Sequence, residues 1–221
     1  MGVGMAGSGR VLAIANTKGG VGKSTLAGNL AWAFATEAKK TVLLVDADPQ
    51  ASITKWFDLA ETGPFDRTQL TTARVLQQQL PRLRQQYALI LVDCPPMQSD
   101  VTASAVTQAD LGLIPVQPSP LDMLAYSELV PLLRQAQGFN ASLILRFVVN
   151  QMSPRTVLAG EVKESLADAD IPVLPTMIHD RQAYRRVVAQ GSSVVVEQGP
   201  ARDEIILLMG DVLYALETPA A

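Results

Sequence analysis

An apolar run that leads into a glycine-rich turn and then into a helical pattern constrains the fold of this chain more than any other feature. Residues 11–16 (VLAIAN) have the composition of a buried strand, residues 17–22 contain three glycines, and residues 23–37 have helical periodicity. Such a turn brings backbone N–H groups together at a helix start, where the helix dipole favours negative charge. We therefore expect a phosphate-binding loop at residues 17–24.

The loop also supplies the side chains that a nucleoside triphosphate with magnesium requires. Lys23 can reach the β- and γ-phosphates, and the Ser24 hydroxyl can bind Mg²⁺. The other nucleotide-binding residues expected in the loop are Gly19, Gly20, Val21, Gly22 and Thr25. Thr17 stands where the strict phosphate-loop pattern has its first glycine, so that pattern is not fully met. The alternative is a glycine-rich turn without a ligand.

Two acidic motifs end apolar runs and should lie near this loop, because the carboxyl ends of parallel strands meet at the nucleotide crevice. In VLLVDADPQ, Asp46 and Asp48 follow a predicted strand at 41–46. In LILVDCPP, Asp93 follows a predicted strand at 88–93. We expect Asp93 to help hold Mg²⁺, and Asp48 to orient the attacking water or to sense the γ-phosphate. A helix N-cap is the alternative role for any aspartate after a strand.

Short apolar runs alternate with longer stretches of helical periodicity along the chain. This alternation predicts a single-domain α/β P-loop NTPase, with a mostly parallel twisted sheet and helices on both faces. Further strands are expected at 111–116 and 143–149, with weaker candidates at 173–177 and 193–196. The expected helices occupy 23–37, 50–57, 72–86, 99–107, 120–136, 156–168, 180–190 and 202–216. Residues 1–10 are expected to be a flexible tail, and residues 11–217 to form the domain.

Composition argues against several kinds of site. The 221 residues carry a formal net charge of −3, so contact with nucleic acid would require a local basic patch. Cys94 is the only cysteine and His179 the only histidine, which excludes an intrachain disulfide and argues against a zinc or iron–sulfur site. No stretch reaches the roughly 18 apolar residues of a membrane span. We therefore expect a soluble, cytoplasmic protein.

The three motifs together resemble the deviant Walker-A ATPases of the ParA/MinD family, whose loop reads K-G-G-x-G-K-[ST]-T. KGGVGKST at 18–25 matches this loop in full, and DADPQ at 46–50 and LVDCPP at 91–96 match two further signatures. The resemblance extends over nearly the whole chain and is closest to the short ParA-type partition and cargo-positioning ATPases. It implies ATP and Mg²⁺ as cofactors, and hydrolysis of ATP to ADP and phosphate that a partner protein stimulates.

The resemblance assigns roles to two further residues. Lys18 corresponds to the lysine that reaches the phosphates of the partner subunit in an ATP-bound homodimer, which would make it catalytic together with Lys23 and Asp48. A solvated loop lysine is the alternative. Asn150 corresponds to a residue that hydrogen-bonds adenine, and NQMS lacks the aspartate of a guanine-reading motif, so ATP is favoured over GTP. A plain turn residue is an equal alternative for Asn150.

Other features favour one branch of this family. The segment after Arg202 has acidic residues and no further cation, which argues against a membrane-anchoring helix of the MinD type. A single cysteine argues against the iron–sulfur carriers, and a first strand at 11–16 leaves no room for an operator-reading N-terminal domain. The remaining branch binds DNA non-specifically as an ATP dimer and positions plasmids or other cargo on the nucleoid. Its partner would be a ParB-like or other cargo-adaptor protein.

Basic residues in HDRQAYRRVVAQG are the candidates for a DNA-facing surface. Arg181 and Arg185 are four residues apart, so a helix over 180–190 would place them on one face, with Arg186 beside them. Doubling such a patch in a dimer would multiply the phosphate contacts. A solvated helix face, partly neutralised by Asp180, is the alternative. A metabolic ATP-dependent ligase or kinase and a membrane-cycling regulator are the other functions that the sequence leaves open.

Overall fold

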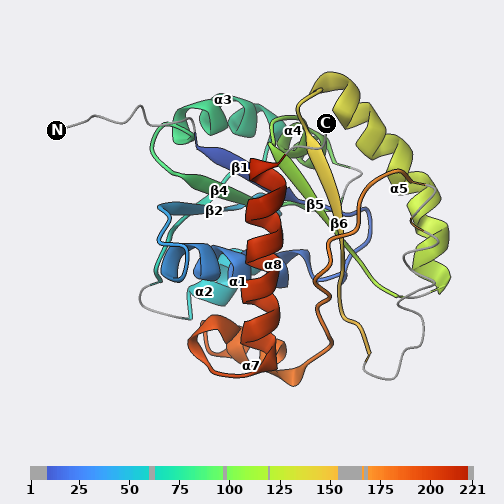
Figure 1. Ribbon diagram of the computed structural model, residues 1–221. Helices are drawn as coiled ribbons and strands as arrows, with labels where there is room; N and C mark the ends of the chain where they lie inside the picture. Colours follow the sequence, from blue (N-terminus) through green and yellow to red (C-terminus); the bar gives the residue numbers. More distant parts are fainter. Residues whose placement is uncertain are drawn as a thin grey trace.

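Six strands form the central sheet of the computed structural model, which describes residues 9–59, 63–96, 99–118, 120–153, 166 and 169–218 (Figure 1). The strands are β1 (Arg10–Ile14), β2 (Val42–Asp46), β3 (Asp66–Gln69), β4 (Leu89–Asp93), β5 (Leu111–Val116) and β6 (Ile144–Val149). Their order is β3-β2-β4-β1-β5-β6, and every neighbouring pair is parallel. The expected parallel α/β sheet is confirmed.

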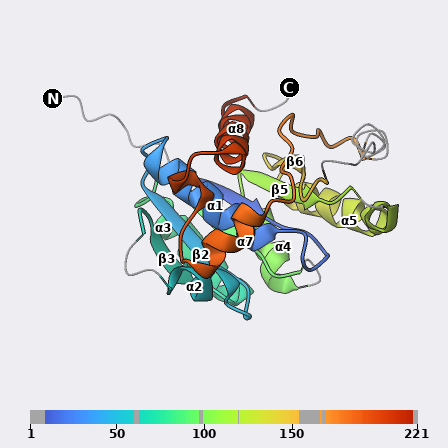
Figure 2. The same ribbon diagram turned by 90° about the horizontal axis from the view of Figure 1, so that it is seen from below.

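Helices cover both faces of this sheet, as the view from below shows (Figure 2). One face carries α1 (Lys23–Thr36), α2 (Ser52–Phe57), α7 (Gln182–Ala189), the short 3₁₀ helix η1 (Val194–Val196) and α8 (Pro200–Glu217). The other face carries α3 (Ala73–Leu83), α4 (Asp100–Thr107) and α5 (Pro120–Phe139). This arrangement confirms the single-domain fold with helices on both faces.

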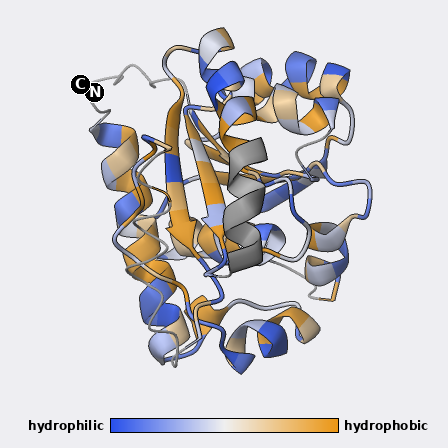
Figure 3. Ribbon diagram, turned by 90° about the vertical axis from the view of Figure 1, so that its right-hand side faces the viewer, coloured by the Kyte–Doolittle hydropathy of each residue, from blue (hydrophilic) through white to orange (hydrophobic). Residues whose placement is uncertain are grey.

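Two hydrophobic cores lie on the two sides of the sheet, because successive residues of a strand point to opposite faces. In β1, Leu12 and Ile14 pack beneath α1 and α8, whereas Val11 and Ala13 pack on the side of α3, α4 and α5. All residues of β2 and β4 are buried, as expected for central strands covered on both faces. Figure 3 shows the same pattern as apolar strands between helices of mixed polarity.

The structure contains one strand that the sequence did not predict and lacks one that it did. β3 was not expected, since its sequence DRTQ is polar and mostly exposed at the edge of the sheet. The candidate strand at 193–196 is wrong, because these residues form η1. The reason is local hydrogen bonding: the Ser193 side chain accepts a bond from the Val195 N–H, and the Val194 N–H donates to Asn29.

The weaker candidate strand at 173–177 is reduced to an isolated bridge between Val173 and Phe147 of β6. The predicted helix at 156–168 lies almost entirely outside the described residues. At the other end of the chain, β1 already begins at Arg10, and Gly9 donates a backbone hydrogen bond to Arg84. The expected tail therefore remains a prediction for residues 1–8. None of the described helices is long and apolar enough to span a membrane.

Candidate nucleotide-binding site

The glycine-rich loop connects β1 to α1 and depends on two glycines with positive φ. Gly20 has φ 76° and Gly22 has φ 93°, a region that side chains other than glycine rarely adopt. A Cβ at Gly22 would also lie 2.1 Å from the Nδ2 atom of Asn150, whereas a Cβ at Gly19 would meet nothing within 4 Å. Gly22 is therefore required both for the turn and for the close approach of Asn150.

The N-terminus of α1 is left without a side-chain cap. Its N-cap residue is Gly22, and its first turn contains no acidic residue. In contrast, Thr72 caps α3 and Ser99 caps α4 through their side chains. The first N–H groups of α1 thus lack protein partners of this kind, which suits an anion such as a phosphate.

Three amide side chains fix the glycine-rich loop by hydrogen bonds to its backbone. The buried Asn16 accepts a hydrogen bond from the Lys18 N–H (2.9 Å) and donates one to the Pro115 carbonyl (2.7 Å). Asn150, also buried, donates to the Val21 carbonyl (2.7 Å), and Gln151 donates to the Gly20 carbonyl (3.0 Å). Sequence reasoning missed Asn16 and Gln151, although a buried amide that ends an apolar run is a usable signal.

A cleft of about 380 Å³ lies above this loop. Its described walls include seven of the predicted residues: Gly19, Gly20, Gly22, Lys23, Ser24, Thr25 and Asp48. The other predicted loop residue, Val21, is buried, and its carbonyl accepts the hydrogen bond from Asn150. Sequence reasoning missed Trp56 and Val188, which also line the cleft. The motifs that are far apart in the sequence thus converge on one cleft.

Lys23 is buried at the floor of the cleft, where its Nζ atom donates a hydrogen bond to the Lys18 carbonyl (2.9 Å). Burial lowers the pKa of the Lys23 ammonium, while the Asp93 carboxylate opposes that shift. The ammonium therefore lies between the loop and an acidic strand end. This is a position from which it could neutralise phosphate charge.

Asp93 at the end of β4 is buried, and neither of its carboxylate oxygens has a hydrogen-bond partner among the described residues. The pKa of Asp93 is raised to about 7, chiefly by burial and also by the neighbouring Asp46, although the Ser24 hydroxyl and the Lys23 ammonium oppose the rise. A buried carboxylate without partners needs an explanation, and a cation is the natural one. Carboxylate and hydroxyl oxygens are ligands that Mg²⁺ prefers, so Asp93 and Ser24 fit the metal.

Asp46 and Asp48 have other surroundings. The buried Asp46 accepts hydrogen bonds from the Thr54 N–H (2.9 Å), the Thr54 hydroxyl (2.8 Å) and the Asp48 N–H (3.3 Å), so it holds the first turn of α2. Asp48 accepts a bond from the Gln50 N–H (2.8 Å) and lines the cleft. Asp48 thus remains available to a ligand in the cleft, whereas Asp46 stabilises the protein.

A second cavity of about 290 Å³ adjoins the cleft and shares Thr25, Gln151 and Val188 with it. Asn150 lines this cavity, and its contact with adenine stays a prediction. The opposite wall is formed by residues 178–181 together with Tyr184, Arg185 and Val188.

Glu204 of α8 organises that wall and was missed by sequence reasoning. This buried carboxylate accepts bonds from the Arg181 Nε (3.0 Å) and Nη2 (2.6 Å) atoms and from the His179 N–H (3.3 Å). It also contacts His179 Nδ1 (2.7 Å) and the Tyr184 hydroxyl (3.3 Å). A glutamate in an amphipathic helix gives no sequence signal for such a role.

The three arginines proposed for DNA do not share a helix face. Arg181 is the N-cap residue of α7, with extended backbone (φ −124°, ψ 140°), so the predicted helix over 180–190 is too long and the common face with Arg185 is wrong. The physical reason is that Arg181 pairs with the buried Glu204. Arg185 pairs with Asp180 (2.6 Å) and Arg186 with Glu197, on side chains that are 70% and 55% exposed.

The sequence model of the CobQ/CobB/MinD/ParA nucleotide binding domain matches residues 12–194. The chain belongs to this family. Among its relatives, "Maintenance of carboxysome distribution protein A" of Gloeobacter kilaueensis is 37% identical over 86% of each chain. The protein of the same name from Halothiobacillus neapolitanus is 31% identical over 91% of this chain and 95% of its own.

Solved structures agree on the fold. Cobyrinic acid a,c-diamide synthase from Mycobacterium smegmatis, with a bound ATP analogue and magnesium, superposes with a TM-score of 0.79 at 22% identity, covering 96% of this chain and 97% of that one. The resemblance to the ParA/MinD ATPases is thus confirmed. As a member of this family the chain is an ATPase, and its cofactors are ATP and Mg²⁺.

Proposed function

We propose that Mg·ATP closes two copies of this chain into a homodimer, that the dimer binds DNA non-specifically, and that a cargo-bound adaptor protein stimulates hydrolysis and release. In this cycle the ATPase positions cargo over the nucleoid. Dimer formation, DNA binding, stimulation by the adaptor and transport of cargo go beyond the ATPase activity of the family.

The position of Lys18 is the observation that carries this proposal. Its backbone is held on both sides, because its N–H donates to Asn16 and its carbonyl accepts from Lys23. Its side chain is exposed, and the described residues that line the cleft include Lys23 but not Lys18. A lysine whose backbone is fixed in the loop, and whose exposed side chain does not line the cleft of its own copy, suits a phosphate that is bound by a second copy.

Within one copy, the chain's own residues would bind and orient the triphosphate. The N–H groups of the loop and of the first turn of α1 would hold its oxygens, with Lys23 adding positive charge. Ser24 and Asp93 would hold Mg²⁺, which neutralises charge on the phosphates when it is bound. Asp48 would orient the attacking water from the wall of the cleft, and Asn150 would contact the adenine.

The kind of cargo is proposed from the relatives. Two of them are named for the maintenance of carboxysome distribution, and two others are named as chromosome-partitioning proteins. We therefore favour a protein microcompartment over a plasmid as the cargo, and an adaptor bound to that compartment, in the place of a ParB-like protein, as the activator.

For DNA contact, Arg185 and Arg186 are the stronger candidates among the three arginines. Their partners Asp180 and Glu197 are themselves 46% and 39% exposed, and exposed ion pairs contribute at most about 1 kcal/mol. DNA phosphates could therefore replace these carboxylates at little cost. Arg181 is the weakest candidate, because leaving Glu204 buried without its cation would cost more.

Replacing Lys18 by Ala tests the dimer. We expect the variant to bind Mg·ATP as a monomer, to lose ATP-dependent dimers in light scattering coupled to gel filtration, and to lose adaptor-stimulated hydrolysis. Lys39→Ala is a matched control, since Lys39 is an exposed lysine beyond the C-terminus of α1. Unchanged ATP-dependent dimers in Lys18→Ala would refute the proposed role.

The DNA proposal has its own test. Substituting Arg185 and Arg186 together by Ala should weaken binding to unrelated DNA evenly and reduce its dependence on salt, as measured by gel shift with ATP. Replacing the exposed Arg74 and Arg82 of α3 is a control with the same change in net charge. Equal affinity of both double variants would place the DNA surface elsewhere.

A further inference from the structure

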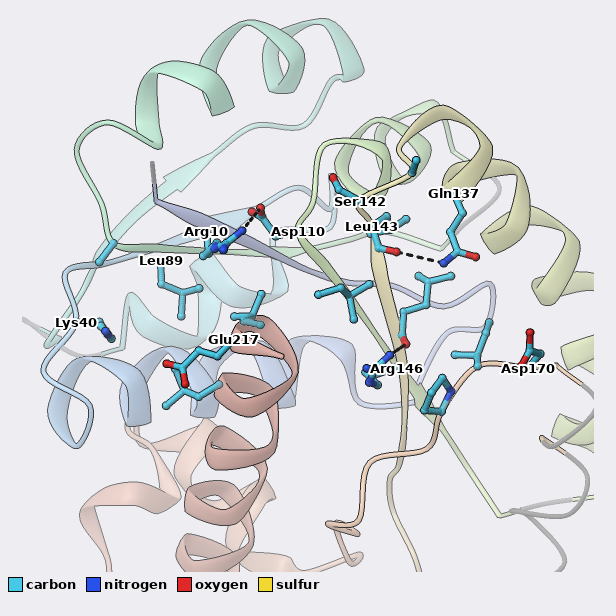
Figure 4. A pocket seen from close by; sticks show the side chains of 18 residues that line it. Arg10, Lys40, Leu89, Asp110, Gln137, Ser142, Leu143, Arg146, Asp170 and Glu217 are labelled. Atoms are coloured by element: carbon cyan, nitrogen blue, oxygen red, sulfur yellow. Dashed lines mark hydrogen bonds and ion pairs between the residues drawn. The ribbon is translucent and has the colours of Figure 1, made fainter. Parts of the chain in front are cut away.

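A cavity of about 870 Å³, drawn in Figure 4, lies where several strands of the sheet begin, whereas the nucleotide cleft lies where they end. It is formed where β1, β4, β5 and β6 begin, and the C-terminal turn of α8 closes one side. Charged and polar side chains, among them Arg10, Lys40 and Asp110, form part of its wall. The apolar part consists of aliphatic side chains and one proline: Leu89, Leu143, Ile171, Pro172, Leu213 and Leu216. Its volume lies in the range of small-molecule sites, about 300–1,000 Å³.

Arg146 of β6 projects into this cavity, whose wall combines aliphatic side chains with charged and polar ones. It is partly buried and belongs to the sheet face that α8 covers, like Ile144 and Val148 two residues to either side. Its Nη1 atom donates a hydrogen bond to the Leu145 carbonyl (2.8 Å), and within the described residues Arg146 forms no ion pair. Burial lowers the pKa of the Arg146 guanidinium, and no carboxylate opposes that shift.

This lack of a counter-charge distinguishes Arg146 from comparable residues. A partly buried guanidinium normally has a carboxylate beside it, because desolvating an unpaired charge is costly. The other partly buried arginines in the described part of the chain are all paired: Arg84 with Asp110, Arg181 with Glu204 and Arg202 with Glu37.

None of the acidic residues that line the cavity serves as a counter-charge for Arg146 within the described residues. Asp110 is occupied by Arg84 (2.7 Å), Arg10 (3.0 Å) and the Val11 N–H (2.7 Å). Asp170 pairs with Arg134 of α5 (3.3 Å). Glu217 is exposed at the end of α8, and no ion pair joins it to Arg146 within the described residues.

We propose that this cavity binds an organic anion that combines a carboxylate with an aliphatic body, with Arg146 as the residue that recognises the carboxylate. A guanidinium presents a planar fork of donors that matches a carboxylate, and the donors of Arg146 beyond Nη1 are available to such a ligand. The leucine and isoleucine walls accept the aliphatic part. The site is separate from the ATPase cleft, so nucleotide and anion bind at the same time.

Octanoate is the probe for the test, and octylammonium is the probe with reversed charge. Titration by calorimetry and by saturation-transfer NMR, both with saturating Mg·ADP present, should show one octanoate site and no octylammonium site. Arg146→Leu should weaken octanoate at least about tenfold, since a hydrogen bond to a charged group contributes about 1.5–3 kcal/mol. Arg82→Leu removes an exposed arginine of α3 and should leave the affinity unchanged.

The Arg146→Leu variant should remain folded, because it exchanges a charge without a counter-ion for an aliphatic side chain next to the aliphatic part of the wall. Glu217→Gln should strengthen octanoate binding slightly by removing a like charge near the mouth. Wild-type protein that does not bind octanoate, equal affinity in Arg146→Leu, or displacement of octanoate by Mg·ADP would each overturn the proposal.

Discussion

The ends of β2 and β4 carry aspartates that are paired in register, Asp46 with Asp93, yet their surroundings are opposite. Both follow a buried aliphatic run and both are fully buried. Asp46 accepts three hydrogen bonds, two of them from Thr54, whereas Asp93 accepts none among the described residues. The same local sequence thus produces one carboxylate that is satisfied by the protein and one that is not.

The difference separates a structural carboxylate from one suited to a ligand. The hydrogen bonds to Asp46 tie the end of β2 to the first turn of α2, so they stabilise the folded protein. Asp93 is desolvated and only partly compensated by the Ser24 hydroxyl and the Lys23 ammonium, which costs stability and is tolerated where a cation restores the balance. The two residues should therefore respond in opposite ways to the same substitution.

The largest expected effect is on hydrolysis. Asp93→Asn keeps the shape of the side chain but removes the charge that would hold Mg²⁺, so we expect ATP turnover to fall by about 100-fold or more. Phosphate release at saturating Mg·ATP measures this loss. Nearly wild-type turnover in the variant would mean that Asp93 does not act on the metal.

The next effect is a pH dependence of the free energy of unfolding in the protein without metal and nucleotide. The pKa of Asp93 is raised to about 7, so below that pH the folded protein keeps a proton that the unfolded chain loses near pH 4. Stability should therefore fall as pH rises from about 4 to about 7 and level off above, by an amount on the order of 2–4 kcal/mol. Urea unfolding in EDTA should show this slope in the wild type and a weaker slope in Asp93→Asn. If the free energy of unfolding had the same pH dependence in both proteins, Asp93 would not be the group that causes the slope.

Much of the fold was predictable from sequence, because buried strands are continuous aliphatic runs between helices. The predicted strands at 41–46 and 88–93 agree with β2 and β4 to within a residue. β3 was not predictable in this way, since an exposed edge strand such as DRTQ needs no apolar pattern. The valines at 194–196 were misleading, because their backbone bonds to Ser193 and Asn29 rather than to a neighbouring strand.

For the site, contiguous motifs were predictable and distant partners were not. Lys23, Ser24 and Asp48 are recognised by their spacing and do line one cleft. Asn16 contacts Pro115, 99 residues away, and Gln151 contacts Gly20, 131 residues away. Such contacts depend on the strand order of the folded sheet, which a single sequence does not state.

Asp46→Asn should lower the free energy of unfolding, whereas the same substitution at Asp93 should leave it unchanged or raise it. An asparagine keeps only one accepting oxygen, so its amide nitrogen would face either the two donors of Thr54 or the N–H of Asp48, and the remaining bonds would lose the carboxylate charge. We expect destabilisation of about 1–3 kcal/mol, the cost of a buried group that loses its hydrogen-bond partner. Urea unfolding at pH 8 measures it, where Asp93→Asn should instead be at least as stable as the wild type. Destabilisation of equal size in both variants would remove the distinction between the two carboxylates.

Thr54→Val has the smallest expected effect and tests how the bonds to Asp46 are shared. The substitution removes the hydroxyl that donates to Asp46, but it keeps the backbone N–H that donates to the same oxygen. We expect a loss of about 1 kcal/mol in the free energy of unfolding. Thr107→Val is a control, since that hydroxyl donates to a carbonyl within α4.

The double variant Asp46→Asn with Thr54→Val then closes a mutant cycle. If the hydroxyl acts through Asp46, the two losses should be less than additive by about 0.5–1 kcal/mol, because the second substitution removes a bond that the first has already weakened or broken. Additive losses would mean that Thr54 stabilises α2 through its bond from Gln69 rather than through the aspartate.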